Sequence, residues 1–449
     1  MHDVELKYGS ELIPFSLPEG AVRLSHTEPQ KSVHPERIRA ELRSRLNARG
    51  RSFRNAGIVV SDKTRLSQYP EYLPLLTGVL LDSGLKKGDI TFYIAYGTHP
   101  VQSEQESLDS YGETFREFRF VHHDSRDSER LIYLGQTARG TAVKVLGEVL
   151  EHDLLITFGA ISHHYFAGFG GGRKLLFPGL AGYDSILQNH SLYLDFKNRK
   201  ICSGCQSGYL ENNPLARDLE EISSLLPEHI EIHGILNGRK EVCEIHMGST
   251  YEDFKTVCNR YDTFFRSPED TLYDLVVAST GGYPKDINFI QSHKSIHNAA
   301  SFIRDGGTLV ILAECRDGIG NRAFMEIFEP GGWDRIFEEM EKQYRNNAGT
   351  ALAMLDKSRR IAIRFVTSLD EETCRIMGAV KTTVNEAREL ITGESGRTVA
   401  AQQSRTAAQN PGQTVAAQQS PTAAGEQSRT AAGQQYRTAW IENASLLYK

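Results

Sequence analysis

A glycine-rich stretch over residues 161–190 constrains the fold of this chain more than any other segment. It follows an apolar run over residues 154–158, which has the character of a buried strand in a parallel sheet. Three consecutive glycines occupy residues 170–172. Because glycine lets the backbone come close to a ligand, this triplet indicates backbone amides presented to an anion such as phosphate. A flexible turn is the alternative interpretation of the triplet.

The same stretch carries an amine between two histidines. Lys174 follows His164 by ten residues and precedes His190 by sixteen. A nucleophilic amine, imidazole nitrogens and a phosphate cradle together indicate a cofactor site. The phosphate-loop pattern is not met, since no Gly-Lys-Ser/Thr is correctly placed, and the dinucleotide fingerprint lacks its downstream acidic residue. An ordinary nucleotide-binding fold is therefore not the best fit.

Strand and helix patterns alternate along the chain, which predicts α/β domains with mostly parallel sheets flanked by helices. In the first half we expect helices over residues 34–50 and 71–84, strands over 57–61, 89–95 and 118–121, and a crossover helix over 141–151. Asp62, Arg65 and His99 come directly after two of these strands, where open α/β sheets bind ligands. A helix-capping aspartate and a solvated arginine remain the alternative interpretation of the first two.

A turn-rich segment, RSPED at residues 266–270, predicts a domain boundary. We expect an N-terminal domain over residues 1–266 and a C-terminal domain over 270–393. A helix over 288–304 in the second domain places Gln291 and Lys294 on one face. Residues 394–436 repeat with a period near eight and hold almost no large apolar residue, so we expect a disordered insertion. Residues 437–449 then restore a terminal strand.

Composition excludes several classes of function. The net charge of −6 gives no reason to expect a nucleic acid or an anionic membrane as partner. No apolar stretch reaches the roughly 20 residues that span a bilayer, and no secretory signal is evident, so we expect a cytoplasmic protein. Six cysteines suggest reduced thiols. A zinc site remains an alternative, with the candidate ligands Cys202, Cys205, Cys243 and His246.

Four separated motifs, in order, resemble those of the lactate racemase family, whose members use a nickel-pincer nucleotide. They are SDKTR at residues 61–65, YGTH at 96–99, HHYFAGFGGGRK at 163–174 with NH at 189–190, and GYPKDINFIQSHK at 282–294. The resemblance runs from Tyr8 to about residue 390. It implies two α/β domains with the active site in the cleft between them.

The resemblance also implies roles for individual residues. Lys174 corresponds to the lysine that joins the cofactor covalently, and His190 to the protein ligand of nickel, a metal that suits square-planar geometry. His99 and His164 correspond to a pair of acid/base histidines. Four residues correspond to the substrate site, in which Arg65 and Lys294 would hold the carboxylate and hydroxyl: Asp62, Arg65, Gln291 and Lys294. The residues expected to bind the cofactor are Gly170, Gly171, Gly172, Arg173, Lys174 and His190.

The activity implied is racemisation or epimerisation of a small 2-hydroxy acid by reversible hydride transfer, with cofactor-maturation enzymes as partners. Pro100 follows His99 where the family commonly has an arginine, and His163 and His293 are additional histidines. These departures favour a substrate larger or more polar than lactate, such as a sugar acid. The alternatives are a nickel-nucleotide carrier without racemase activity and a conventional NAD-dependent dehydrogenase. The oligomeric state is not predicted.

Overall fold

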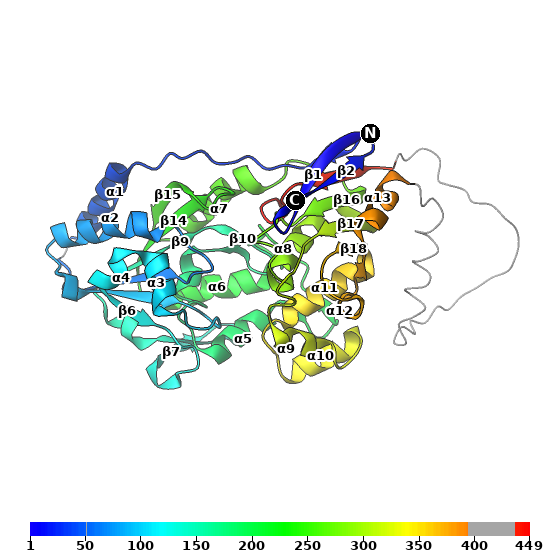
Figure 1. The fold of residues 1–449 in the computed structure, drawn as a ribbon. Coiled ribbons are helices and arrows are strands. Elements are labelled where there is room, and N and C mark those ends of the chain that lie inside the picture. The colour runs from blue at the N-terminus through cyan, green and yellow to red at the C-terminus, as the bar shows by residue number, and fades with distance from the viewer. Residues whose placement is uncertain (51, 394–435) are drawn as a thin grey trace, which may run out of the picture. The chain divides into compact units, whose positions relative to one another are not determined.

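The computed structural model describes residues 1–50, 52–393 and 436–449, which form two compact units. The Lys174 unit comprises His26–Arg266 and Tyr344–Gly349. The terminal unit comprises Met1–Ser25, Ser267–Gln343 and the described part of Thr350–Lys449. Each unit contains one six-stranded sheet with helices packed on it (Figure 1). The expected two-domain α/β fold is therefore confirmed, whereas the expected position of the active site between the domains stays a prediction.

The sheet of the Lys174 unit has the order β15-β14-β9-β4-β5-β6. Only β15 runs antiparallel to its neighbour in this sheet. The strands are β4 (Ala56–Ser61), β5 (Ile90–Ala95), β6 (Arg119–His122), β9 (Leu154–Ala160), β14 (Ile230–Leu236) and β15 (Val242–Gly248). Small two-stranded sheets accompany it: β7 (Leu131–Gln136) with β8 (Ala142–Leu146), β10 (Ser162–His164) with β11 (Gly168–Gly170), and β12 (Leu194–Asp195) with β13 (Lys200–Ile201).

The helices of this unit begin at recognisable signals. Ser103 precedes α3 and Thr250 precedes α7, and each side chain accepts a hydrogen bond from the third residue of its helix. Pro35 opens α1, a position where its missing N–H is not needed. The α-helices are α1 (Pro35–Ala48), α2 (Tyr69–Asp82), α3 (Glu104–Tyr111), α4 (Glu113–Glu117), α5 (Tyr183–Ser191), α6 (Pro214–Leu225) and α7 (Tyr251–Phe265). Short 3-10 helices are η1 (Lys87–Asp89), η2 (Ser128–Arg130), η3 (Gly147–Glu151) and η4 (Gly172–Leu175).

The sheet of the terminal unit has the order β19-β18-β17-β16-β20-β3, with all neighbours parallel. Its strands are β3 (Val22–Arg23), β16 (Tyr273–Ser279), β17 (Ile303–Leu312), β18 (Ala362–Val366), β19 (Val380–Lys381) and β20 (Thr438–Ile441), and a hairpin joins β1 (His2–Tyr8) to β2 (Glu11–Leu17). The helices are α8 (Phe289–Ala300), α9 (Arg322–Met325), η5 (Glu326–Phe328), α10 (Trp333–Lys342), α11 (Ala348–Arg360), α12 (Glu371–Ile376) and α13 (Val384–Thr392). The expected insertion over residues 394–436 lies outside the described residues except for its last position.

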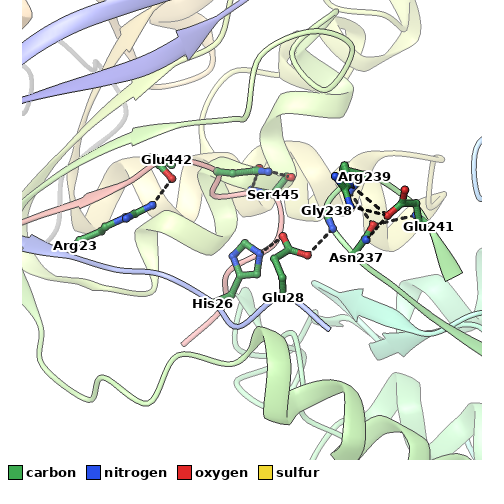
Figure 2. Close-up of polar contacts among 10 residues, drawn as sticks. Arg23, His26, Glu28, Asn237, Gly238, Arg239, Glu241, Glu442 and Ser445 are labelled. Carbon is green, nitrogen blue, oxygen red and sulfur yellow. Dashed lines mark hydrogen bonds and ion pairs between the residues drawn. The ribbon is translucent and has the colours of Figure 1, made fainter. Parts of the chain in front are cut away.

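The N-terminal residues group differently from the expected boundary at residue 266. Residues 1–25 belong to the terminal unit, because the buried faces of the β1–β2 hairpin pack on its sheet. Leu6 and Phe15 share one apolar cluster with Leu275 of β16. Figure 2 shows Arg23, at the end of β3, paired with Glu442 beyond β20 at 2.5 Å.

The chain enters the Lys174 unit through a short polar connection. Glu28 accepts hydrogen bonds from the backbone N–H of Gly238, at 2.8 Å, and pairs with His26 at 2.7 Å (Figure 2). These contacts fasten the incoming segment to the turn between β14 and β15.

The segment over residues 141–151 is not the crossover helix expected from the sequence. Residues 142–146 form β8 instead, paired antiparallel with β7, and a 3-10 turn follows. Val143 and Val145 are buried while Lys144 between them is exposed. This alternation with a period of two is the pattern of a strand, and it overrides the helical interpretation.

The two faces of the Lys174 sheet are covered by different segments. Residues of α1 and α2 pack on one face, in one cluster with Ile58 and Val60 of β4. Leu175, Leu176 and Leu180 pack on the other face. The segment that carries Lys174 is therefore anchored directly on the sheet. In the described ranges, no helix is both long and apolar enough to pass through a membrane.

A buried tyrosine ties together the carboxyl ends of two central strands. The hydroxyl of Tyr69, which is 0% exposed, accepts a hydrogen bond from the N–H of Ser61 at 2.9 Å. It donates to the carbonyl oxygen of Phe158 on β9 at 2.8 Å. Both partners are backbone groups at buried strand positions, where an unpaired polar group is costly. Tyr69 thus fixes the points from which the loops after β4 and β9 depart.

The substitution Tyr69→Phe should lower the free energy of unfolding by about 2 kcal/mol, because it leaves a buried N–H and a buried carbonyl without their partner. Equilibrium urea unfolding measures the change. Tyr133→Phe on β7 is the matched control, since Tyr133 is 57% exposed and its loss should cost less than about 0.5 kcal/mol. Equal stability of the two variants would contradict the assigned role of Tyr69.

Candidate active site

Three neighbouring strands deliver the predicted site residues of the Lys174 unit. β4 lies between β5 and β9 and is parallel to both. Asp62 follows β4, His99 lies four residues beyond β5, and the glycine-rich stretch begins after β9. Because the carboxyl ends of parallel strands meet at one edge of the sheet, these segments leave the sheet side by side.

Asp62 and His99 form a hydrogen-bonded pair. Nδ1 of His99 lies 2.6 Å from Oδ2 of Asp62, whose side chain is 2% exposed. The other carboxylate oxygen accepts hydrogen bonds from the N–H of Thr64 at 3.0 Å and from its hydroxyl at 2.6 Å. Burial alone raises the pKa of Asp62, but the hydrogen bonds from His99 and Thr64 and the charge of Arg65 bring it below its ordinary value. Asp62 is therefore an ionised, fully engaged carboxylate that holds the ring of His99.

The turn that carries His99 is fastened to the segment after Lys174. Gly97 has φ +57° and donates its N–H to the carbonyl oxygen of Gly179 at 2.8 Å. The N–H of His99 closes the turn on the carbonyl of Tyr96 at 3.0 Å. The side chain of His99 keeps 40% of its area exposed, so the ring can reach a bound molecule.

Close packing and positive φ angles require glycine at two positions of the triplet, Gly171 and Gly172. Gly171 has φ +82°, and a Cβ there would lie 2.4 Å from the carbonyl oxygen of Ala160. Gly172 has φ +52°, and a Cβ there would lie 2.7 Å from Glu231 and 2.9 Å from His233. At Gly170 a Cβ would lie 3.3 Å from the hydroxyl of Ser162. These contacts explain the glycines through the backbone path, and their expected part in anion binding stays a prediction.

Arg173 is buried beneath this loop. It is 2% exposed, and its guanidinium lies 4.7 Å from the ring centre of Tyr251 and 4.9 Å from that of Phe254, both on α7. Among the residues that the structure describes, none offers a hydrogen-bond partner to its three guanidinium nitrogens. The expected role of Arg173 in cofactor binding stays a prediction.

Lys174 and His190 lie in one electrostatic environment. Burial lowers the pKa of Lys174 well below 10.5, and the charges of Arg65 and Arg173 lower it further. Burial also lowers the pKa of His190 to about 3, with repulsion from Lys174 and Arg65 acting in the same direction. Both side chains are half-buried by surface area. The unit therefore presents an amine biased towards its neutral form and an uncharged imidazole, with Arg65 acting on both.

The position of His190 is supported by a buried polar network that the sequence alone did not reveal. Asn189, its neighbour on α5, donates to Asp218 of α6 at 2.8 Å. The same carboxylate oxygen accepts from the hydroxyl of Thr141 at 2.8 Å. Asp218 and Asn189 are 0% exposed. The only available sequence signal was Asp218 inside a helical pattern, which also fits a solvated aspartate.

A second buried layer lies below Gly172 on β14. Glu231 lies 3.4 Å from His229 and 3.3 Å from His233. Burial raises the pKa of Glu231, but the polar contact with His229 and nearby positive charge bring it below its ordinary value. The only signal in the sequence was that a glutamate and a histidine alternate with isoleucines along this strand. In the structure, the first six positions of the strand are all buried.

The remaining predicted residues lie on other elements. Gln291 and Lys294 are on α8 of the terminal unit, where Nζ of Lys294 donates to Oε1 of Gln291 at 3.3 Å. This contact confirms that the two side chains share a helix face. Of the additional histidines, His163 is engaged with Asp262 at 2.6 Å, and Nδ1 of His293 lies 2.6 Å from the carbonyl of Ile290.

The alternative zinc site does not assemble. Cys243 and His246 are both on β15, three positions apart, and so point to opposite faces. Cys243 is fully buried, whereas His246 pairs with Glu244 at 2.8 Å. Across residues 1–50, 52–393 and 436–449, no group of three or more His, Cys, Asp or Glu side chains is placed to hold a metal ion.

Comparison with known proteins identifies the family. The family model for the lactate racemase N-terminal domain matches residues 8–201, and that for the lactate racemase C-terminal domain matches residues 269–365. A lactate racemase of Thermoanaerobacterium thermosaccharolyticum is 30% identical over 340 residues, which cover 73% of this chain and 78% of that protein. A lactate racemase of Lactiplantibacillus plantarum is 30% identical over 284 residues, 62% of this chain and 65% of that protein.

Solved structures agree with this assignment at the level of the fold. The lactate racemase apoprotein of Thermoanaerobacterium thermosaccharolyticum superimposes with a TM-score of 0.77 at 23% identity, covering 99% of both chains. A Thermotoga maritima protein gives a TM-score of 0.60 at 17% identity, covering 79% of this chain and 93% of its own. With both family models matched in order along it, the chain belongs to the lactate racemase family and is an enzyme of the racemase class.

Proposed function

We propose that this enzyme interconverts the configurations of a 2-hydroxy acid by reversible hydride transfer to a nickel-pincer nucleotide joined to Lys174. The observation that carries the proposal is the shared environment of Lys174 and His190, in which burial and the charge of Arg65 disfavour protonation of both. The family supports racemisation, and the relatives named lactate racemase support a 2-hydroxy acid as the substrate class.

The residues present fit such a cofactor. A neutral amine is the form that can enter a covalent bond with a carboxyl-derived group, and a neutral imidazole is the form that can bind a metal. Lys174 and His190 are biased towards these forms before any ligand arrives. When bound, the nucleotide supplies a ring carbon that accepts and returns hydride, and His190 supplies a nitrogen ligand to nickel.

The other predicted residues then bind and orient the substrate. Arg65 and Lys294 are proposed to hold the carboxylate and hydroxyl, so that the 2-keto acid stays in place between the two half-reactions. His99 takes the hydroxyl proton as the Cα hydrogen leaves with its electron pair. Asp62 stabilises the positive charge that His99 then carries. His164 serves the opposite face of the substrate, with Gln291 near the carboxylate.

The substrate is proposed to be larger or more polar than lactate, because Pro100 follows His99 where the family commonly places an arginine. Pro100 and His99 are both exposed. The test is a panel of 2-hydroxy acids, including lactate and sugar acids, incubated with enzyme made together with cofactor-maturation enzymes. Chiral chromatography should show interconversion of a sugar acid or another polar member. Activity on lactate alone would contradict this choice of substrate.

Replacing either His99 or His164 by Gln should reduce turnover by about 10²- to 10⁴-fold, the usual contribution of a positioned acid or base. The nickel content and the mass of the adduct on Lys174 should remain unchanged, because neither histidine is proposed to bind the cofactor. His34→Gln, at the exposed start of α1, is the matched control and should keep full turnover. Unchanged turnover in both site variants would show that neither histidine is the acid or the base, whereas a nickel-loaded unsubstituted chain without turnover would indicate a carrier of the nucleotide instead of a racemase.

His190→Asn should flatten the acid dependence of stability in the chain without cofactor. In the unfolded chain His190 takes up a proton below about pH 6.5, whereas in the folded chain it does so only near pH 3. The unfolded state therefore binds more protons in this window, and stability present above pH 6.5 is lost as the pH falls towards 3. Removing this one group should decrease the slope of the free energy of unfolding against pH by up to about 1.4 kcal/mol per pH unit.

Urea unfolding measures this slope at pH values between 4 and 8 that are about half a pH unit apart. Other histidines that are buried (His123, His233) or half-buried (His122, His152) also have lowered pKa values, so the variant should retain part of the acid sensitivity. Above pH 7.5 the difference between the two proteins should be constant, which provides an internal control. Parallel curves over the whole range would show that His190 is not held in an uncharged state.

A further inference from the structure

The two histidines proposed as acid and base are held by opposite kinds of hydrogen bond. Nδ1 of His99 faces Oδ2 of Asp62 at 2.6 Å. Asp62 is ionised, and an ionised carboxylate can only accept hydrogen bonds. Nδ1 of His99 must therefore carry a hydrogen, which leaves Nε2 as the atom that can take up a proton.

His164 has the reverse arrangement. Its Nδ1 accepts hydrogen bonds from the backbone N–H groups of Phe166, at 3.2 Å, and Ala167, at 3.1 Å. A backbone N–H can only donate, so Nδ1 of His164 cannot carry a hydrogen in this structure. The ring is consequently neutral, with its one hydrogen on Nε2.

The two amides that fix this tautomer are themselves held in place. His164 ends β10, and its partner across the hairpin is Gly168 of β11. The carbonyl oxygen of Phe166 accepts a hydrogen bond from the side chain of Asn213 at 2.7 Å. The carbonyl oxygen of Gly168 accepts one from the N–H of Gly208 at 2.9 Å. Phe166 and Ala167 are buried, so the turn is part of the packed structure.

We infer that the acid/base pair is asymmetric: Asp62 sets His99 to accept a proton at Nε2, whereas the amides of Phe166 and Ala167 hold His164 as a neutral ring whose hydrogen lies on Nε2. This inference rests on the proposed function for its catalytic meaning. Asp62 and the 166–167 turn are positioning groups, because they act through the two rings.

The asymmetry has a consequence for each half-reaction. When the substrate hydroxyl faces His99, its O–H bond breaks, an N–H bond forms at Nε2, and the ring becomes a cation paired with Asp62. When the hydroxyl faces His164, Nε2 already carries a hydrogen and cannot take another proton. His164 can take or deliver a proton only after its Nδ1 is released by the amides of the 166–167 turn. His99 can thus act on one face of the substrate without rearrangement. His164 can act on the other face only if the 166–167 turn moves.

Turnover rates cannot reveal this asymmetry through kcat/KM, since the equilibrium between two enantiomers fixes the ratio of their kcat/KM values. The position of the hydrogen on each imidazole ring must therefore be measured directly. Two-bond ¹H–¹⁵N correlation spectra of the full-length chain, labelled with ¹⁵N-histidine and free of cofactor, distinguish protonated from unprotonated ring nitrogens. The His99→Gln and His164→Gln variants assign the two rings by loss of their signals.

The expected spectrum shows Nδ1 protonated in His99 and unprotonated in His164, with Nε2 of His164 carrying the hydrogen. A protonated Nδ1 in His164, or the same tautomer in both rings, would overturn the inference. Because the measurement needs neither cofactor nor substrate, it is independent of whether racemisation is observed. A failure of the proposed function would appear in turnover and leave the spectrum unchanged.

Asp62→Asn provides a matched variant. The N–H of Thr64 must still find an acceptor, so the amide oxygen should take the place of Oδ1 and the amide NH₂ should face His99. Nδ1 of His99 would then accept a hydrogen bond and lose its hydrogen, giving the tautomer of His164. The His164 signals should not change. If His99 kept a protonated Nδ1 in this variant, Asp62 would not be the group that sets its tautomer.

Discussion

The parallel pairing of β4 with both β5 and β9 is the constraint on which the site depends. Its register places Ser61 opposite Ala95 and Val60 opposite Phe158. The loops that follow β4, β5 and β9 therefore leave the sheet within a residue or two of one another. Neighbouring strands are about 4.8 Å apart, so short side chains from adjacent loops can touch. The hydrogen bond between Asp62 and His99, separated by 37 positions in the chain, is the direct result.

This dependence on strand ends also explains which features could be predicted from the sequence. Buried parallel strands are short apolar runs, and helices are marked by their caps and their period, so the limits of β4 and β5 and the start of α8 were predicted closely. The predicted helix over residues 288–304 extended past the observed end of α8 at Ala300 into β17. The segment over residues 141–151 was missed because its alternation is only five residues long. The placement of the β1–β2 hairpin on the terminal sheet depends on contacts with β16 that no local pattern encodes.

The site shows the same division. The chemistry-bearing residues could be named because they occupy motifs after strands, but their supporting groups could not. Asp218 and Glu231 are ordinary acidic residues in sequence, and only the fold reveals them as buried partners of α5 and of the glycine loop. The tautomer of His164 is even less accessible to sequence reasoning, since it is set by backbone N–H groups, which every residue except proline possesses.

The electrostatics of the Lys174 unit give these separate features one physical meaning. Burial lowers the pKa values of Lys174 and His190, and the charge of Arg65 lowers both further, with Lys174 also acting on His190. Such an arrangement raises the free energy of the protonated forms and leaves the permanently charged guanidinium as the dominant cation among the three. If Lys174 were covalently bound and His190 ligated to a metal, neither could compete with Arg65 for a substrate carboxylate. In that case, the repulsion that disfavours charge on the amine and the imidazole would also reserve Arg65 for the substrate.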